Sequence, residues 1–577
     1  MLTLTERHSR AREAVFRLKV WGLTGQRLWQ NLRQPLPRFL CSASTATTPV
    51  LAASSSALWN PNDNAANWLL TAGKVENLRI AARRIHGLQV PAGAVFSFWR
   101  HVGNPNFGQG YVLGREIREG CVVPTVAGGL CQLSNALYDA ALRAGFPIVE
   151  RHRHTQVIAG SLAEQGRDAT VKWNYVDLRF QATVAFRLEV ELTADELRVQ
   201  FRGEAAVSFT PATAPAYLVP SHLHDCYSCG NLACFKYPGQ VPTRPAATKT
   251  TFILDENQPE LAHYVQSTAQ ATDAVLLPLR PMRLARRGRY VWAASGLPAS
   301  VTLWKTAGLR ELQLRLAARR GRNIFAQNLR LDQQVAQAAA RRLTPDSTHL
   351  VVAQSLLPFL WQAGALGGRT FDVLLTRLPA ELLHQRLDQA AARYPSSPTL
   401  ADFRAPQSFV EAESQALTRA RHLITPHQEL AALFGNKSIR LDWELPPAAP
   451  AAPGSGILFP ASAVARKGAY EMRRLATELG LKLSVAGRAT EAPGFWQNVE
   501  TTLVGSDPLA GIGLVVYPAY VEHQPRLLLR ALAAGIPVVA SVACGLGPMP
   551  GLTLVPMGDY GALRAAVEGA LGGAVTA

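Results

Sequence analysis

The run Ala127-Gly-Gly-Leu-Cys131-Gln-Leu-Ser-Asn135, followed by Glu150-Arg-His152-Arg-His154, combines a thiol with candidate bases and is where we expect chemistry in this protein. Apolar residues at helical spacing after the two glycines predict a helix over 130–144, which Gly145 ends. Cys131 then lies in the first helical turn, where unpaired N–H groups and the helix dipole favour an anion. The sequence therefore predicts a thiol that ionises readily at a helix N-terminus.

Two histidines follow this helix on a predicted strand over 147–158, and the period of two places His152 and His154 on one face. Either imidazole could deprotonate the thiol of Cys131. Asp168 could orient a histidine, as carboxylates do in Cys-His-Asp arrangements. The alternative interpretation is a buried structural cysteine with histidines at the surface.

Residues beside this cysteine are candidates for holding a substrate. They are Gly128, Gly129, Gln132 and Arg151. The two glycines would let a substrate carbonyl approach backbone N–H groups, which could then act as an oxyanion site.

Six motifs resemble the VanW domain in order and spacing, over about residues 76–205. They are Val95-Phe-Ser-Phe-Trp-Arg-His-Val-Gly103, Gly108-Gln-Gly-Tyr111, Gly128-Gly-Leu-Cys-Gln132, Glu150-Arg-His-Arg-His154, Asp168-Ala-Thr-Val171 and Asp177-Leu-Arg-Phe180. The family is named from a vancomycin-resistance cluster. Some cell-surface members are reported as L,D-transpeptidases that cross-link peptidoglycan stems through the motif cysteine, a role that the resemblance assigns to Cys131. Ala127 stands where many members have a third glycine, and a positive φ there would strain it.

The composition is that of a large globular protein with several domains. The chain has 577 residues, of which 48% are hydrophobic and 17% are charged. Its 59 basic and 41 acidic residues give a net charge of +18, which favours anionic partners such as phosphates, nucleotide sugars or lipid headgroups. The basic residues accompany no nucleic-acid-binding motif, so the sequence disfavours nucleic acid. We expect an anionic small molecule, a glycan or a peptidoglycan precursor as the partner.

The N-terminal region lacks the order of a signal peptide, and no apolar run reaches the length of a membrane span. We therefore expect a cytoplasmic protein, with peripheral contact at the inner membrane as an option. The segment 7–38 is basic and carries tryptophans, so it could lie on an anionic membrane surface, although packing on its own domain is the favoured interpretation. Because peptidoglycan is cross-linked outside the cytoplasmic membrane, a cytoplasmic location opposes transpeptidase activity.

A second cluster of cysteines has the spacing of metal ligands. Cys226, Cys229 and Cys234 follow His224 closely, and this set can close a tetrahedral structural zinc site. Iron–sulfur ligation would need a fourth thiolate that is not near in the sequence. Three reduced thiols in a loop are the remaining alternative.

Beyond the cysteine cluster the pattern changes to alternating strands and helices, which predicts parallel sheets covered by helices. We expect a multidomain chain with an α+β domain followed by two α/β Rossmann-like units. The predicted segments are a basic N-terminal segment packing on the next domain (1–75), the VanW-like domain (76–210), a Cys-rich connector (211–248), a first Rossmann-like half (249–445) and a second half (446–577).

The second half resembles retaining GT-B glycosyltransferases over about residues 455–575. The resemblance lies in Arg466-Lys-Gly468, Val485-Ala-Gly487, Tyr517-Pro-Ala-Tyr-Val-Glu522 and Leu529-Arg-Ala-Leu-Ala-Ala-Gly-Ile-Pro-Val-Val539. It implies that Lys467 binds a nucleotide diphosphate and that two glutamates eight positions apart contact the sugar and the ribose. Glu522 is kept, but Arg530 occupies the second place, and a guanidinium cannot accept hydrogen bonds from ribose hydroxyls. Active sugar transfer and a degenerate binding module both remain open.

Three functions thus compete for this chain. The favoured one is a cell-envelope protein that acts on a peptidoglycan-type or glycan precursor through a Cys/His thiol site, by acyl transfer or hydrolysis. The second is a glycosyltransferase that uses a nucleotide sugar. The third is a non-catalytic scaffold that binds a glycan.

Overall fold

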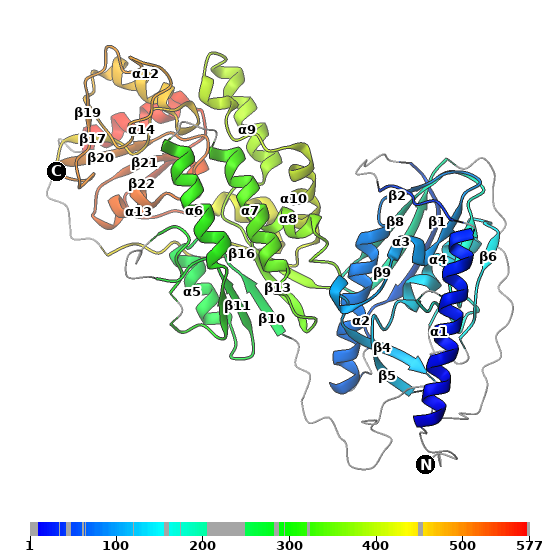
Figure 1. Cartoon of the computed structure of the whole chain (residues 1–577). Helices are drawn as coiled ribbons and strands as arrows, with labels where there is room; N and C mark the ends of the chain where they lie inside the picture. The colour runs from blue at the N-terminus through cyan, green and yellow to red at the C-terminus, as the bar shows by residue number, and fades with distance from the viewer. Residues whose placement is uncertain are drawn as a thin grey trace. The chain divides into compact units, whose positions relative to one another are not determined.

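The computed structural model divides the chain into two compact units (Figure 1). Unit 1 contains Met1–Lys249, Leu343–His349 and Ala363–Thr370, and unit 2 contains Thr250–Arg342, Leu350–Gln362 and Phe371–Ala577. The structure describes residues 10–33, 35–41, 48–60, 63, 65–118, 121–154, 161–173, 175–204, 249–281, 288–293, 295–319, 324–447 and 454–573.

Unit 1 is built on a four-stranded antiparallel sheet. Its strand order is β1 (Val50–Ala57), β9 (Glu196–Arg202), β8 (Phe186–Leu192) and β2 (Leu88–Val90). Helices α2 (Ala65–Ile85) and α4 (Cys131–Arg143) pack against this sheet. Four stacked or tilted rings fill the core beside it, namely Phe146, Phe180, Phe186 and Phe201. This arrangement confirms the α+β domain.

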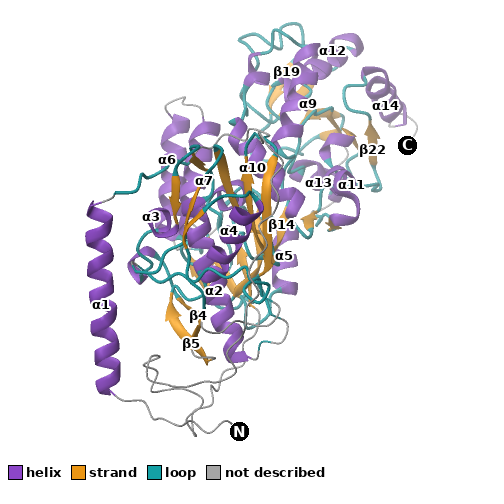
Figure 2. Ribbon diagram, turned by 90° about the vertical axis from the view of Figure 1, so that its right-hand side faces the viewer, coloured by secondary structure: helices purple, strands orange, loops and turns teal. Residues whose placement is uncertain are grey.

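Smaller elements complete unit 1. They are a three-stranded sheet of β3 (Val95–Ser97), β7 (Arg179–Gln181) and β6 (Ile148–Glu150), a hairpin of β4 (Leu113–Arg118) and β5 (Cys121–Val126), and the short helices α3 (Phe98–Val102) and η1 (Phe107–Gln109). Helix α1 (Arg10–Arg33) lies along the side of this unit (Figure 2).

The structure differs from the sequence-based expectations at two places in unit 1. The boundary predicted at residue 75 falls inside α2, and β1 upstream of it pairs with β9 along its length. The strand predicted over 147–158 is shorter, because β6 ends at Glu150. Beyond it, the backbone N–H of His154 donates to the carboxylate of Asp168 and not to a neighbouring strand.

The first sheet of the C-terminal region has seven strands. Their order is β12 (Ser300–Thr302), β11 (Ala274–Leu277), β10 (Lys249–Ile253), β13 (Ser347–Ala353), β14 (Thr370–Leu374), β15 (Leu423–Thr425) and β16 (Ser438–Arg440). The pairs β10–β11, β11–β12, β14–β15 and β15–β16 are parallel. The accompanying helices are α5 (Pro259–Thr268), α6 (Trp304–Arg319), α7 (Ile324–Ala340), α8 (Leu357–Gln362), α9 (Ala380–Arg393), α10 (Gln407–Arg419) and α11 (Gln428–Phe434), with the 3₁₀ turns η2 (Pro398–Ala401) and η3 (Gly435–Lys437).

The second sheet of unit 2 is parallel throughout. Its order is β19 (Thr501–Leu503), β18 (Leu483–Val485), β17 (Gly456–Phe459), β20 (Ile512–Tyr517), β21 (Val538–Ser541) and β22 (Leu552–Val555). Helices α12 (Ala469–Leu479) and α13 (Arg526–Ala533) and the turns η4 (Ala465–Lys467) and η5 (Val542–Cys544) lie between these strands in the sequence, and α14 (Tyr560–Gly573) follows the last one. The two predicted α/β units are thereby confirmed. Among the helices that the structure describes, none is long and apolar enough to cross a membrane.

Asn77 fixes the position of the Cys131 loop relative to α2. Its side chain is fully buried, and its amide donates to the carbonyls of Val112 and Gly128, at 3.0 Å each. Its carbonyl accepts from the N–H of Val112 at 2.9 Å. One side chain of α2 therefore holds both the start of β4 and the glycine turn before α4.

We expect Asn77→Ala to lower the free energy of unfolding of unit 1 by about 2 to 4 kcal/mol, because it leaves buried backbone groups unpaired. Urea unfolding followed by tryptophan fluorescence measures this change. Leu69→Ala is the matched control on the same helix, since the Leu69 side chain is 54% exposed, and its effect should stay within about 0.5 kcal/mol. Equal losses in both variants would contradict the assigned role of Asn77.

Candidate functional site

Cys131 is the first residue of α4, as the sequence predicts. The turn before it contains two positive φ angles, 60° at Ala127 and 97° at Gly129. An alanine therefore holds the left-handed conformation that favours glycine. The N–H groups of Leu130 and Cys131 have no protein acceptor among the described residues, so this turn presents two backbone donors beside the thiol.

Neighbouring segments approach the two glycines of the turn closely. A Cβ on Gly128 would lie 2.4 Å from the carbonyl oxygen of Gly114, and a Cβ on Gly129 would lie 2.1 Å from Cγ of Lys74. Glycine is thus required at both positions by packing inside unit 1. The predicted contact of these glycines with a substrate stays a prediction.

Asp168, His154 and Cys131 form a connected chain of polar contacts. The Asp168 side chain is fully buried, and it accepts hydrogen bonds from the backbone N–H of His154 at 2.6 Å and from Nδ1 of the same residue. Because Asp168 occupies Nδ1, the other ring nitrogen is left for the hydrogen bond with the Cys131 thiol. The sulfur also lies 3.6 Å from Oγ1 of Thr170 and 3.8 Å from the carbonyl oxygen of Val171.

The electrostatics of Asp168, His154 and Cys131 favour a charged pair of His154 and Cys131. Burial opposes ionisation of Cys131, but the hydrogen bond and the charge of His154 outweigh it and lower the pKa of the thiol. Burial also opposes the charge on His154, but the hydrogen bonds with Asp168 and Cys131 raise its pKa to about 10. The site can therefore hold a thiolate beside an imidazolium.

His152, the other predicted base, is not part of the polar contacts that join Asp168, His154 and Cys131. Its side chain is 47% exposed, and its Nε2 lies 3.3 Å from a carboxylate oxygen of Glu150. Its backbone forms an isolated bridge with Thr170. The structure thus brings only one of the two histidines to the thiol.

Gln132 and Arg151, both predicted to bind substrate, contact the protein in this structure. The amide of Gln132 donates to Oγ of Ser56 at 2.9 Å and to the carbonyl of Ala57 at 2.7 Å. The guanidinium of Arg151 donates to the carbonyl of Asp168 at 2.8 Å and lies over the ring of Tyr138. Arg151 therefore supports the loop that carries the buried carboxylate.

Two buried polar residues of α4 also hold that loop, and sequence reasoning missed them. Asn135 accepts from the N–H of Ala169 at 2.8 Å, and Ser134 donates to the carbonyl of the same residue at 2.5 Å. Their position in the sequence could have identified them, because residues three and four positions after Cys131 share a helical face with it.

A cavity of about 750 Å³ opens beside the thiol. Its walls include Cys131, His154, Trp59, Trp99, Trp173 and Lys74. Burial and the neighbouring charge of Arg115 lower the pKa of Lys74 to about 7, and its Nζ donates to the carbonyl of Leu58 at 2.6 Å. The cavity thus combines a reactive sulfur with aromatic walls and an amine.

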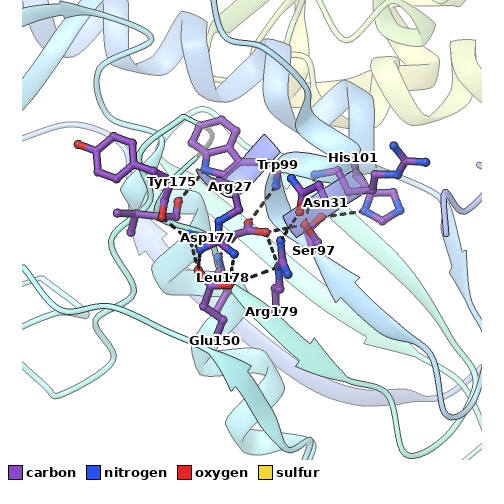
Figure 3. Close-up of polar contacts among 12 residues, drawn as sticks. Arg27, Asn31, Ser97, Trp99, His101, Glu150, Tyr175, Asp177, Leu178 and Arg179 are labelled. Atoms are coloured by element: carbon purple, nitrogen blue, oxygen red, sulfur yellow. Dashed lines mark hydrogen bonds and ion pairs between the residues drawn. The ribbon is translucent and has the colours of Figure 1, made fainter. Parts of the chain in front are cut away.

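A second polar network, drawn in Figure 3, lies around Asp177. The nearly buried carboxylate accepts from Oγ of Ser97 at 2.6 Å, from the N–H of Trp99 at 3.2 Å and from Nε of Arg179 at 2.8 Å. The indole N–H of Trp99 donates to the carbonyl of Val176 at 2.8 Å. This network fixes a tryptophan of the cavity wall.

In unit 2 the structure brings Lys467 and Glu522 together as an ion pair. The distance from Nζ to Oε2 is 2.8 Å, and the hydroxyl of Tyr517 donates to the same oxygen at 2.5 Å. Burial opposes the charge of Glu522, but Lys467 and these hydrogen bonds lower its pKa to about 2. Arg530 lies 3.7 Å from Asp507.

The carboxyl ends of strands from the two sheets of unit 2 contact each other. Nε2 of His427, after β15, lies 3.0 Å from the carbonyl oxygen of Glu522, after β20. The N–H of Leu378, after β14, donates to Nε2 of His523 at 3.1 Å. The loops after these strands therefore meet within unit 2, and both histidines are held by backbone contacts.

The predicted metal ligands Cys226, Cys229, Cys234 and His224 lie outside the described residues. Within the described ranges, no group of three or more His, Cys, Asp or Glu side chains could hold a metal ion. The zinc site stays a prediction.

The fold and the thiol site define an α+β domain with a cysteine at a helix start, joined to an α/β unit. Residues 73–202 match the family described as VanW like protein, so the chain contains a VanW-like domain. Vancomycin B-type resistance protein VanW of Enterococcus faecalis (strain ATCC 700802 / V583) is 28% identical over 149 residues, which are 25% of this chain and 53% of that protein. Uncharacterized protein YoaR of Bacillus subtilis (strain 168) is 38% identical over 105 residues, 18% of this chain and 34% of that protein. The chain thus covers about half or less of these relatives.

Solved glycosyltransferases resemble the chain weakly. Sucrose-phosphate synthase from Thermosynechococcus elongatus has a TM-score of 0.34 at 15% identity, covering 57% of this chain and 91% of that one. WaaG, a glycosyltransferase involved in lipopolysaccharide biosynthesis, has a TM-score of 0.29 at 16% identity, covering 56% and 91%. The strand order of its two sheets defines unit 2 as α/β.

We expect the Cys131 thiol to react with iodoacetamide at a lower pH than an ordinary cysteine, and His154→Ala to move this reactivity towards about pH 8.5, the range of an ordinary cysteine. The pH dependence of alkylation, followed by peptide mass spectrometry, measures both. His152→Ala is the matched control and should leave the profile in place. A profile unchanged by His154→Ala would show that His154 does not activate the thiol.

Proposed function

We propose that unit 1 is a thiol-dependent acyltransferase or hydrolase in which Cys131 is the nucleophile. The connected chain Asp168–His154–Cys131 on the wall of the 750 Å³ cavity carries this proposal. The three side chains have the order of a Cys-His-Asp arrangement, with a buried carboxylate, an imidazole and a thiol.

In the first step, the thiolate of Cys131 attacks the carbonyl carbon of an amide, and a C–S bond forms. The N–H groups of Leu130 and Cys131, for which the described residues offer no acceptor, would stabilise the negative charge on the carbonyl oxygen. The C–N bond then breaks, and the leaving amine takes the proton of the imidazolium of His154. A thioester on Cys131 remains.

In the second step, an amine or a water molecule attacks the thioester. The neutral His154 accepts a proton from this attacking group, the C–S bond breaks, and the thiolate–imidazolium pair is restored. Asp168 acts by holding the ring in one orientation through Nδ1. Attack by an amine gives acyl transfer, and attack by water gives hydrolysis.

We infer that the acyl donor is a peptide stem of a peptidoglycan-type precursor. The inference is supported by the matched relative that is named as a vancomycin-resistance protein and by the cavity itself. Peptide stems carry free carboxylates. Arg115 on the cavity wall is a cation that would have to exchange its partner Asp63 for such a carboxylate, and Lys74, whose pKa is lowered to about 7, is only partly charged at neutral pH.

We expect the chain to convert disaccharide tetrapeptide muropeptides into cross-linked dimers or shortened stems, which mass spectrometry detects. Cys131→Ala should abolish the product, and Asp168→Asn should lower the rate at least about 100-fold, because the imidazole loses its orienting carboxylate. The control is Leu69→Ala, which touches neither the cavity nor the three side chains. If a covalent adduct formed on Cys131 but no product was released, Cys131 would still be the nucleophile, but the muropeptide would be excluded as the acyl acceptor.

A second candidate function is nucleotide-sugar binding in unit 2. The observation that favours it is the meeting of strand carboxyl ends around Glu522, His427 and His523, because ligands of open α/β sheets lie at such ends. Lys467 would bind the diphosphate, and it would have to exchange its partner Glu522 for the ligand.

We expect isothermal titration calorimetry with UDP-glucose to give a dissociation constant in the micromolar to millimolar range if this candidate is right. Lys467→Ala should then weaken binding about tenfold or more, because a diphosphate loses its cation. Arg564→Ala, which removes an exposed arginine elsewhere in unit 2, is the control. No heat in the wild-type titration would exclude this donor.

A further inference from the structure

Helix α1 attaches to unit 1 through polar contacts. The guanidinium of Arg27 donates to both carboxylate oxygens of Glu150, at 2.9 and 2.5 Å, and to the carbonyl of Tyr175 at 3.1 Å. Arg179 donates to the side-chain oxygen of Asn31 at 3.1 Å (Figure 3). One face of α1 is therefore tied down by an ionic and hydrogen-bonded network.

A different face of α1 presents large apolar side chains to solvent. Its members, with their exposed fractions, are Leu18 (69%), Trp21 (80%), Leu28 (51%), Trp29 (53%) and Leu32 (80%). At about 100° per residue they lie within an arc of about 100°, and Arg27 and Asn31 lie about 110° to 150° from the middle of that arc. Hydrophobic residues scattered singly need no explanation, but a continuous stripe with two tryptophans does.

The charges of the segment select the partner for this stripe. Residues 10–33 contain six basic residues and one acidic residue. Lys19 and Arg33 are exposed, and the guanidinium carbon of Arg33 lies 3.5 Å from the ring centroid of Trp29. A second copy of the helix would bring like charges together, whereas an anionic surface would be attracted to them.

We propose that α1 lies flat on an anionic lipid surface, with Leu18, Trp21, Trp29 and Leu32 in the boundary between headgroups and acyl chains. Tryptophan suits this boundary because its ring is apolar and its N–H is polar. Basic residues beside an apolar stripe add attraction to anionic headgroups. The network of Arg27 and Glu150 then holds unit 1 at the surface. This proposal does not depend on the thiol chemistry.

The test is co-sedimentation of the full chain with vesicles of phosphatidylcholine, with or without about 30% phosphatidylglycerol. We expect the chain to bind the anionic vesicles and to dissociate from them as salt rises from about 0.05 to 0.5 M. Tryptophan fluorescence of the bound chain should shift to shorter wavelength. Equal binding to both kinds of vesicle, or binding to neither, would overturn the proposal.

Variants locate the contact on the stripe. The double variant Trp21→Ser with Leu32→Ser should weaken vesicle binding at least about tenfold, because two apolar side chains no longer leave water. Leu23→Ser is the matched control, since Leu23 is 47% exposed and lies about 140° from Leu18 around the helix. Equal losses in the two variants would contradict the assignment.

Light scattering in the absence of lipid separates the membrane from a protein partner. We expect a monomer in the wild type and in the double variant. A dimer that the double variant dissociates would identify the stripe as a contact between two copies and would overturn the lipid proposal. The alkylation rate of Cys131 should be the same in the wild type, the double variant and Leu23→Ser. Equal rates show that unit 1 keeps its fold in all three proteins.

Discussion

The buried carboxylate of Asp168 is the constraint on which the thiol site depends. An unpaired charge with no solvent access is costly, so its oxygens must be satisfied by donors nearby. His154 supplies two of these donors, one from its backbone and one from its ring. The same contacts pull the chain out of the strand that ends at Glu150 and turn the imidazole towards the sulfur. Local departure from regular structure is thus a consequence of satisfying a buried charge.

The turn before Cys131 is constrained by close packing and not by a buried charge. Gly114, Gly128 and Gly129 approach backbone or the stem of Lys74 at distances that no Cβ could occupy. The turn is therefore held by close packing of α2, β4 and α4, and Asn77 locks it with three hydrogen bonds. As a result, the N–H groups at the start of α4 are positioned by rigid elements, which is what a preorganised oxyanion site needs.

The sequence contained most of the fold and half of the site. Helix spacing located α4 and Cys131, because the spacing of apolar residues reports directly which helical face is buried. It named Asp168 as a possible partner but could not choose between His152 and His154, because only the folded loop shows which histidine contacts that carboxylate. It also missed β1, whose serines are weak strand formers and are held by pairing with β9. Lys74 could not be predicted as a cavity residue, because only tertiary packing brings it to the thiol.

The ion pair of Lys467 and Glu522 bears on how unit 2 could bind an anion. The resemblance to GT-B glycosyltransferases selected Lys467 and Glu522 as candidate ligands, but the sequence could not show that the two residues form an ion pair with each other. The pKa of Glu522 is lowered to about 2, so the carboxylate stays ionised and keeps its hold on the lysine at neutral pH. A diphosphate must therefore displace a charge-assisted contact that also includes the hydroxyl of Tyr517. The ion pair therefore reduces the affinity expected for an anionic ligand in unit 2, whereas the thiol chemistry proposed for unit 1 uses its charged pair as the reactive group.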